Sequence, residues 1–191
     1  MVFLTKQDIR RAAGAVLFCG VHGQSLTSDM RSLLRETQAR GVIWFTRNVN
    51  DPMQLAELGL QVKEAFFSQD AGPLAIGVDQ EGGRVARIRS PATVWPPMQQ
   101  IAAADDTEKV ASVARAIARE LRCMNIDIDF APVLDVRTNP DDPIIGDRSF
   151  GSDAEHVAKM GAAFIRAMQA EGVSACGKHF PGHGDANLDS H

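Results

Sequence analysis

The last fifteen residues of the chain concentrate side chains that can exchange protons. The stretch GKHFPGHGDANLDSH, from Gly177 to His191, holds three of the five histidines. Within it, Asp189 and His191 stand two residues apart. A carboxylate at that spacing can accept the Nδ1–H of the imidazole, which fixes the tautomer and leaves Nε2 for proton transfer. The pair is therefore a candidate for acid–base chemistry.

Two other interpretations of this stretch stay open at this point. His179 and His183 have the H-x3-H spacing, and Asp185, Asp189 and His191 follow them, so the ligand types suit zinc. Against a metal site, His183 follows a Pro-Gly turn, which excludes presentation of both histidines on one helix. The remaining interpretation is a solvated, histidine-rich tail without any site.

A second polar segment is VDQEGGRVARIR, residues 78–89. Asp79 and Glu81 come directly after an apolar run, and Arg84, Arg87 and Arg89 follow closely. The Gly-Gly pair inside the segment lets the backbone turn tightly beside a ligand. The composition fits either a ligand site or a loop in which Asp79 simply pairs with an arginine.

A third polar segment is APVLDVRTNPDDPIIGDRSFG, residues 131–151. Its three prolines predict a stiff, ordered loop. Arg148 lies near the end of the loop, and a guanidinium presents a rigid fork that can hold two oxygen atoms. Without a ligand, Arg148 would pin the loop to Asp147 or Asp141.

These segments follow a repeating pattern of strands and helices. Apolar runs predict strands at residues 15–20, 41–45, 74–79, 126–131 and 173–176. Apolar stripes at helical spacing predict four helices, at residues 30–37, 51–66, 110–121 and 152–168. Gly41 would stop the first helix, Asp51 would be the N-cap of the second, and a capping box at 152–155 would begin the fourth. Alternation of this kind indicates a parallel sheet with right-handed crossovers, either doubly wound or a β/α barrel.

The long polar segments favour the barrel, because barrel sites are built at the carboxyl ends of the strands. Lys178 and His179 directly follow the fifth strand and would lie at that mouth. A complete eight-fold barrel takes about 250 residues. We therefore expect about five of the eight units of a (β/α)8 barrel, with residues 1–191 forming the N-terminal, truncated part of one barrel domain.

Bulk composition restricts the function classes. The net charge of −4 argues against a nucleic-acid partner, and no run of eighteen apolar residues predicts a membrane span. We expect Cys19, Cys123 and Cys176 to be reduced core residues, since each lies in an apolar segment. Reduced thiols favour a cytoplasmic location.

The three segments together resemble the signature loops of glycoside hydrolase family 3. More closely, they are similar to the bacterial β-N-acetylhexosaminidases that act in peptidoglycan recycling. The similarity runs over about residues 14–191 and is carried by three motifs in order, which are specific in combination. It implies a barrel that hydrolyses terminal β-linked N-acetylglucosamine (GlcNAc) of muropeptides with retention, without cofactor or metal, in a monomeric parent protein.

The resemblance also implies residue roles. The substrate-binding residues would hold the non-reducing sugar, and they are Asp79, Arg87, Arg148, Lys178 and His179. His191 would be the general acid/base, with Asp189 as its partner. The family's nucleophile is an aspartate on a later strand, to which no residue here corresponds. Other outcomes are a family 3 β-glucosidase or phosphorylase, a sugar-binding protein without turnover, and a metal-dependent hydrolase.

Overall fold

Five parallel strands form the centre of the molecule. The structure is a computed structural model that describes residues 4–67 and 73–184. The strand order in the sheet is β1-β2-β3-β6-β7, and every neighbouring pair is parallel. The strands are β1 (Phe18–Gly20), β2 (Gly41–Trp44), β3 (Ala75–Val78), β6 (Ile128–Asp129) and β7 (Ser174–Ala175). A separate antiparallel hairpin follows β3 and consists of β4 (Gln80–Gly82) and β5 (Val85–Ala86).

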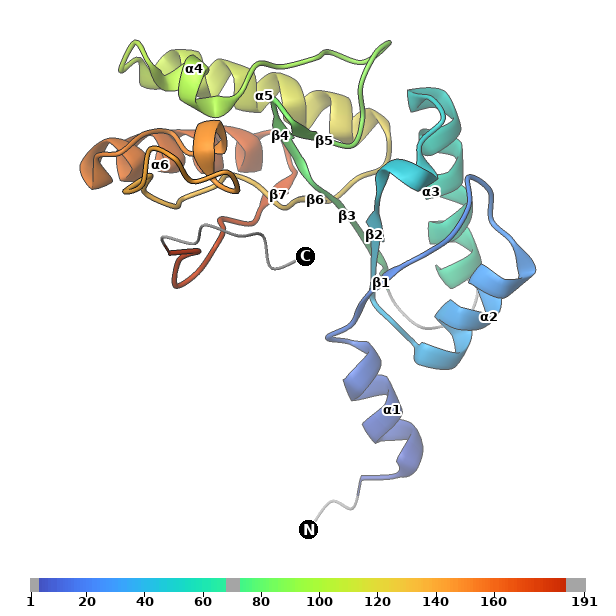
Figure 1. Ribbon diagram of the computed structural model, residues 1–191. Helices are drawn as coiled ribbons and strands as arrows, with labels where there is room; N and C mark the ends of the chain where they lie inside the picture. Colours follow the sequence, from blue (N-terminus) through green and yellow to red (C-terminus); the bar gives the residue numbers. More distant parts are fainter. Residues whose placement is uncertain (1–3, 68–72, 185–191) are drawn as a thin grey trace.

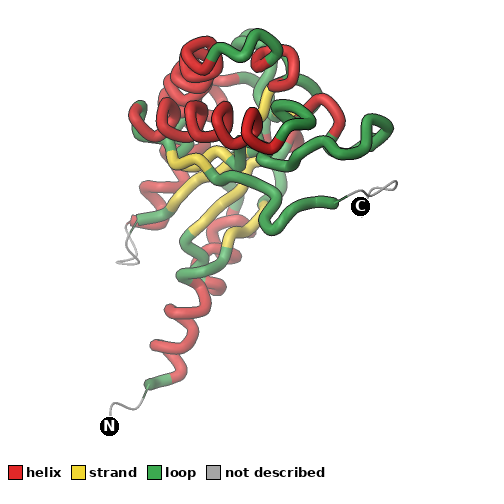
Figure 2. Tube along the Cα trace, turned by 90° about the vertical axis from the view of Figure 1, so that its left-hand side faces the viewer, coloured by secondary structure: helices red, strands yellow, loops and turns green. Residues whose placement is uncertain are grey.

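Helix α1 (Lys6–Gly14) precedes the first strand, and the other helices connect successive strands of the sheet. They are α2 (Ser28–Thr37), α3 (Pro52–Phe67), α4 (Met98–Ala102), α5 (Thr107–Cys123) and α6 (Ala154–Ala170). Helices α2 and α3 lie beside one part of the sheet and α5 and α6 beside the other, whereas α1 extends away from it (Figure 1, Figure 2). The four helices expected from the sequence are confirmed, and the sequence pattern did not predict α1 and α4.

Side-chain caps determine where several helices begin. Asp51 Oδ1 accepts a hydrogen bond from the N–H of Gln54 at 2.9 Å, which confirms the predicted N-cap of α3. The capping box predicted to begin at Ser152 is wrong by one residue. Asp153 is the N-cap of α6, and its Oδ1 accepts from the N–H of His156 at 2.8 Å.

The predicted stop of α2 at Gly41 is also wrong. The helix ends at Thr37, and Gln38 takes the left-handed conformation with φ 52°. Gly41 instead begins β2, where an added Cβ would meet the ring of Phe18. The glycine is needed for a close approach between two strands rather than for a helix end.

The hydrophobic core lies between the sheet and the helices that flank it. Ile76 and Val78 of β3 are fully buried, as are Leu55 and Val62 of α3. Phe164 of α6 is also fully buried. These residues belong to the apolar runs and stripes visible in the sequence, so burial of those positions is confirmed.

The cysteines do not belong to this core. Cys19 is half-buried, and Cys123 and Cys176 are exposed, although all three are free thiols. The prediction of core cysteines is therefore wrong. Cys123 ends α5 and Cys176 follows β7, so both sit at the edges of apolar segments instead of inside them.

The architecture is a TIM-barrel-type α/β fold. Consecutive β/α units add neighbouring parallel strands in chain order, as the sequence alternation predicts. In the described ranges, no helix is both long and apolar enough to cross a membrane. All five strands run in one direction, so the segments that leave their carboxyl ends meet at one edge of the sheet.

Candidate functional site at the carboxyl ends of the strands

Three neighbouring strands deliver the polar segments to one place. Asp79 follows the last residue of β3, and the hairpin β4–β5 returns the chain to Arg87. Lys178 lies just after β7, where an isolated parallel bridge joins it to Val133 in the loop after β6. Segments that are distant in the sequence thus converge at the carboxyl edge of the sheet.

Five charged side chains form one ion-pair cluster at this edge: Asp79, Glu81, Arg87, Arg148 and Lys178. Lys178 Nζ lies 2.8 Å from Asp79 Oδ1 and 2.6 Å from Glu81 Oε1. Arg87 Nη2 lies 3.2 Å from Asp79 Oδ2. Lys178 therefore pairs with both carboxylates, and Arg87 pairs with the second oxygen of Asp79.

Arg148 holds Glu81 through a bidentate pair. Its Nε donates to Glu81 Oε2 and its Nη2 to Glu81 Oε1, both at 2.8 Å. Its Nη1 donates to the carbonyl of Ile144 at 3.1 Å. Glu81 is buried and Arg148 nearly so, with side-chain exposures of 3% and 12%. Paired charge-assisted bonds of this kind are among the stronger polar contacts in proteins.

The cluster keeps Asp79 ionised. Burial by itself would raise the pKa of Asp79, but the hydrogen bond and positive charge of Lys178, together with Arg87, lower that pKa below its ordinary value. The carboxylate is still partly accessible, with 17% of the side chain exposed. It is therefore an anionic acceptor that a ligand hydroxyl can reach.

His179 points to a different partner. Its Nδ1 lies 2.6 Å from Asp135 Oδ2, which also accepts the backbone N–H of His179 at 3.0 Å. Asp135 Oδ1 accepts the N–H of His183. Burial raises the pKa of Asp135, and these three donors outweigh burial and lower it. Asp135 thus ties the start of the last loop to the loop after β6.

The structure places the five candidate binding residues as follows. Asp79, Arg87, Arg148 and Lys178 belong to the ion-pair cluster, and His179 lies beside it on Asp135. The alternative in which Arg148 pairs with Asp147 or Asp141 is wrong, because Arg148 pairs with Glu81 and Asp147 pairs with Arg84. Asp79 does pair with an arginine, so the ion-pair reading of that segment also holds. The candidates Asp189 and His191 lie outside the described residues.

Two members of the site were not among the predicted binding residues. Glu81 was noted beside Asp79, but its two cationic partners lie 67 and 97 residues further along the chain. Asp135 follows the fourth predicted strand, and its donors come from the distant His179 and His183. In both cases the residue type was visible and the partner was not.

A metal site has no support from the resolved geometry. Within residues 4–67 and 73–184, no three histidine, cysteine, aspartate or glutamate side chains are grouped to hold a metal ion. The rings of His179 and His183 do pack edge to face, with centroids 5.7 Å apart. Asp185, Asp189 and His191, which complete the proposed ligand set, are outside those ranges.

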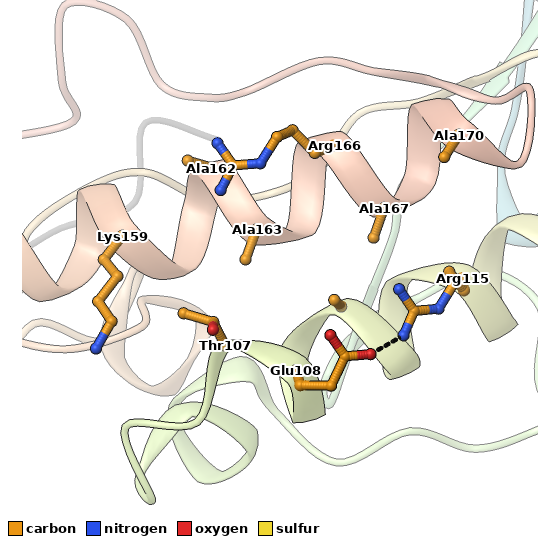
Figure 3. Close-up of a pocket in the computed structure, with 10 residues that line it drawn as sticks. Thr107, Glu108, Arg115, Lys159, Ala162, Ala163, Arg166, Ala167 and Ala170 are labelled. Atoms are coloured by element: carbon orange, nitrogen blue, oxygen red, sulfur yellow. Dashed lines mark hydrogen bonds and ion pairs between the residues drawn. The ribbon is translucent and has the colours of Figure 1, made fainter.

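Two cavities differ in their relation to the candidate binding residues, of which only His179 lines the first. One of about 400 Å³ adjoins His179 and Asp135 and is lined also by Phe180 and Pro181, at the carboxyl edge of the sheet. Another of about 410 Å³ lies between α5 and α6, where Ala163 and Ala167 form part of the lining (Figure 3). The second cavity contains none of the candidate site residues.

Comparison with known proteins agrees with this geometry. The profile of the glycosyl hydrolase family 3 N-terminal domain matches residues 13–191. A β-hexosaminidase of Thiobacillus denitrificans is 42% identical over 181 residues, covering 92% of this chain and 49% of the relative. A β-hexosaminidase of Vibrio cholerae is 40% identical over 176 residues, covering 92% of this chain and 52% of the relative.

Solved structures show the same likeness. A family 3 β-N-acetylglucosaminidase from Paenibacillus has a TM-score of 0.92 at 40% identity, with 98% of this chain and 35% of that chain covered. NagZ from Neisseria gonorrhoeae, in complex with N-trifluoroacetyl-D-glucosamine, has a TM-score of 0.82 at 34% identity, with 92% of this chain and 52% of that chain covered. This chain spans about half the length of the curated relatives it matches. The ordered motifs, the fold and these matches together place the chain in glycoside hydrolase family 3, to whose N-terminal domain it belongs.

Proposed function

We propose that the protein acts as a retaining β-N-acetylglucosaminidase that releases terminal β-linked GlcNAc from peptidoglycan fragments. The observation that carries this proposal is the ion-pair cluster at the carboxyl edge of the sheet. An ionised Asp79 can accept hydrogen bonds from sugar hydroxyls, and Lys178 and Arg148 can donate to sugar oxygens. The likeness to β-hexosaminidases, and to a structure that binds a glucosamine derivative, supports the choice of sugar.

In this proposal, His191 is the general acid/base and Asp189 orients it. Most retaining glycosidases use two carboxyl groups. A neutral imidazole in place of one of them avoids a second anion beside the negatively charged nucleophile, and like charges at short range oppose ionisation. As an imidazolium, His191 would give its Nε2 proton to the leaving oxygen. The neutral imidazole that results would then take a proton from the attacking water.

The nucleophile belongs, we propose, to a later strand of the same barrel domain, of which residues 1–191 are the N-terminal part. The relatives are about twice as long as this chain, which supports that assignment. Asp79 and Asp135, which follow β3 and β6, are already engaged, Asp79 by Lys178 and Arg87 and Asp135 by His179 and His183. Asp129, at the end of β6, is fully buried, which keeps it away from a sugar.

The remaining parts of the proposal concern context. We propose a monomeric whole protein in the cytoplasm, with muropeptides as substrate and with neither cofactor nor nucleic-acid partner. Sugar binding without turnover is a second candidate for this chain by itself, because the described residues assemble the ion-pair cluster, while the carboxylates at the strand ends are either engaged by neighbouring side chains or fully buried. Both candidates require GlcNAc to bind near Asp79.

The first test measures binding of GlcNAc to the purified chain by saturation-transfer NMR and by calorimetry. We expect Asp79→Asn to weaken binding at least tenfold, because the amide cannot replace an ionised acceptor between Lys178 and Arg87. Asp127→Asn is the matched control, since Asp127 pairs with Lys63 at the amino end of β6 and not with the cluster. GlcNAc binding that survives Asp79→Asn unchanged would contradict the proposed site.

Turnover is measured separately with a fluorogenic GlcNAc glycoside. We expect the 191-residue chain to show little hydrolysis, and a version extended to the length of the relatives to hydrolyse the substrate in a manner abolished by His191→Ala. Products are analysed with and without phosphate, because a glycosyl phosphate would identify a phosphorylase. Rapid hydrolysis by the 191-residue chain, lost in His191→Ala, would disprove the assignment of the nucleophile to a later strand.

A further inference from the structure

A buried carboxyl group lies directly beneath the ion-pair cluster. Asp129 is the last residue of β6 and stands opposite Val78 in the parallel register. Its side chain is fully buried, with 0% of the residue exposed. Asp129 Oδ1 accepts the backbone N–H of Gln80 at 2.9 Å. In the part of the chain that the structure describes, Asp129 Oδ2 is buried without a hydrogen-bond partner.

The charges around Asp129 disfavour its ionised form. Lys178, the cation that acts on it, is already engaged by Asp79 Oδ1 and Glu81 Oε1 at 2.8 and 2.6 Å. Burial raises the pKa of Asp129 well above its ordinary value. The N–H of Gln80 and the charge of Lys178 lower that pKa only in part, and the negative charges of Glu81 and Asp79 raise it further.

An aspartate two residues earlier provides the contrast. Asp127 Oδ1 lies 2.7 Å from Lys63 Nζ, and Asp127 Oδ2 accepts the N–H of Ile76 at 2.8 Å. Its side chain is 42% exposed. The Ile-Asp-Ile-Asp sequence therefore presents one paired, solvated carboxylate and one buried carboxyl group without a cation of its own.

We propose that Asp129 is a positioning residue of the sugar site, and that it works as a neutral acid. Through the N–H of Gln80, its Oδ1 fixes the backbone between Asp79 and Glu81, so that these carboxylates lie on either side of Lys178. The Gln80 side chain continues the restraint, because it donates to the carbonyl of Ile88 at 2.8 Å and accepts the N–H of Ile88 at 3.0 Å.

The neutral state of Asp129 matters for the ligand. A third anion at this position would compete for Lys178 and weaken its hold on Asp79, the proposed acceptor of sugar hydroxyls. A protonated Asp129 keeps the backbone contact to Gln80 and leaves Lys178 to the other two carboxylates. This inference rests on the proposed function for its consequence, but its structural half can be tested without any sugar.

The first experiment compares the wild type with Asp129→Asn in urea unfolding between pH 4.5 and pH 8.5. A pKa raised in the folded state means that ionisation of Asp129 opposes folding, so wild-type stability falls as pH rises above the unfolded value of about 3.9. Asparagine retains the acceptor for Gln80 and has no proton to lose. The unfolding constant of Asp129→Asn relative to wild type should therefore fall with rising pH, by as much as about tenfold per pH unit.

Asp127→Asn is the control for loss of a carboxylate that has its own cation. It removes the partner of Lys63, so the variant should be less stable than wild type at neutral pH. An unfolding constant of Asp129→Asn relative to wild type that stays constant or rises between pH 4.5 and pH 8.5 would overturn the proposal.

The second experiment tests the positioning role. Hydrogen exchange at the Gln80 amide, followed by NMR, should stay slow in Asp129→Asn and become at least tenfold faster in Asp129→Ala. GlcNAc affinity should stay within about twofold in Asp129→Asn and fall at least tenfold in Asp129→Ala. Unchanged exchange and affinity in Asp129→Ala would refute the role. Absence of GlcNAc binding in the wild type would refute the proposed function, while the pH and exchange results would still decide the state of Asp129.

Discussion

Replacing Glu81 by glutamine should damage the protein more than any other single charge removal at the site. Glu81 accepts both nitrogens of the Arg148 fork at 2.8 Å and lies 2.6 Å from Lys178 Nζ. Glutamine has the same shape, but its amide end brings donors toward Arg148 or Lys178. The substitution therefore leaves two nearly buried cations without their shared anion.

The magnitude follows from these contacts. Breaking a buried ion pair by removal of one partner costs about 3–5 kcal/mol, since the remaining charge stays out of water. Side-chain exposures of 3%, 12% and 16% for Glu81, Arg148 and Lys178 place this network in the buried regime. A domain of this kind has a free energy of unfolding of about 5–15 kcal/mol, so the loss would be a large fraction of the total.

Urea unfolding followed by tryptophan fluorescence measures the effect, because Trp44 is fully buried in the core. Glu171→Gln is the matched control. Glu171 also accepts a bidentate pair, from Arg119, but that arginine is 68% exposed, so the control should change little. The double variant Glu81→Gln with Arg148→Met should be less destabilised than the sum of its parts. A loss below about 1 kcal/mol for Glu81→Gln, or strict additivity, would refute the reasoning.

Three further outcomes are expected. Stability should fall as pH drops below about 4, because the pKa values of Asp79 and Asp135 are lowered in the folded state. Their contribution is complete above the unfolded-state pKa of about 3.9 and is lost as pH falls through the lower folded-state pKa values. An unfolding midpoint in urea that does not change between pH 5 and pH 2.5 would contradict this. Asp135→Asn should cost about 1–3 kcal/mol, since an amide replaces one of the oxygens that accept from His179 and His183; thermal denaturation checks it, and an unchanged midpoint would speak against it. Gly14→Ala should cost about 1–3 kcal/mol in the same assay, because its Cβ would meet the backbone carbonyl of residue 38, and only a neutral result would count against this packing.

The central strands of the sheet were predictable from the sequence because β2 and β3 are mostly buried, whereas β1 and β7 are partly exposed. Apolar runs near Gly41, Leu74 and Val173 mark where the chain enters the core, and alternation with helical stripes fixes the parallel order. Strand lengths were less predictable. β6 contains two residues where a strand of six, residues 126–131, was predicted. Ile126 and Ala131 are buried, but they lie outside the segment that pairs with the neighbouring strands.

The site was predictable in its location but not in its pairing. Topology brings the segments that follow strands to one edge, while the choice of Asp79, Arg148 and Lys178 within those segments came from the resemblance to family 3. Which cation meets which anion depends on side-chain directions in three dimensions. Asp129 illustrates the limit: it lies within an apolar run, and only the structure shows a buried carboxyl group without a paired cation.

The long sequence separation inside the ion-pair cluster has a consequence for folding kinetics. Asp79 and Lys178 are 99 residues apart, and Glu81 and Arg148 are 67 residues apart. Contacts across such separations form after local helices and neighbouring strands, because closing a long loop costs chain entropy before the contact is gained. The cluster should therefore be largely absent from the folding transition state. Substitutions within it should accelerate unfolding while leaving the folding rate nearly unchanged, so the charges proposed to bind the sugar would also set the lifetime of the native state.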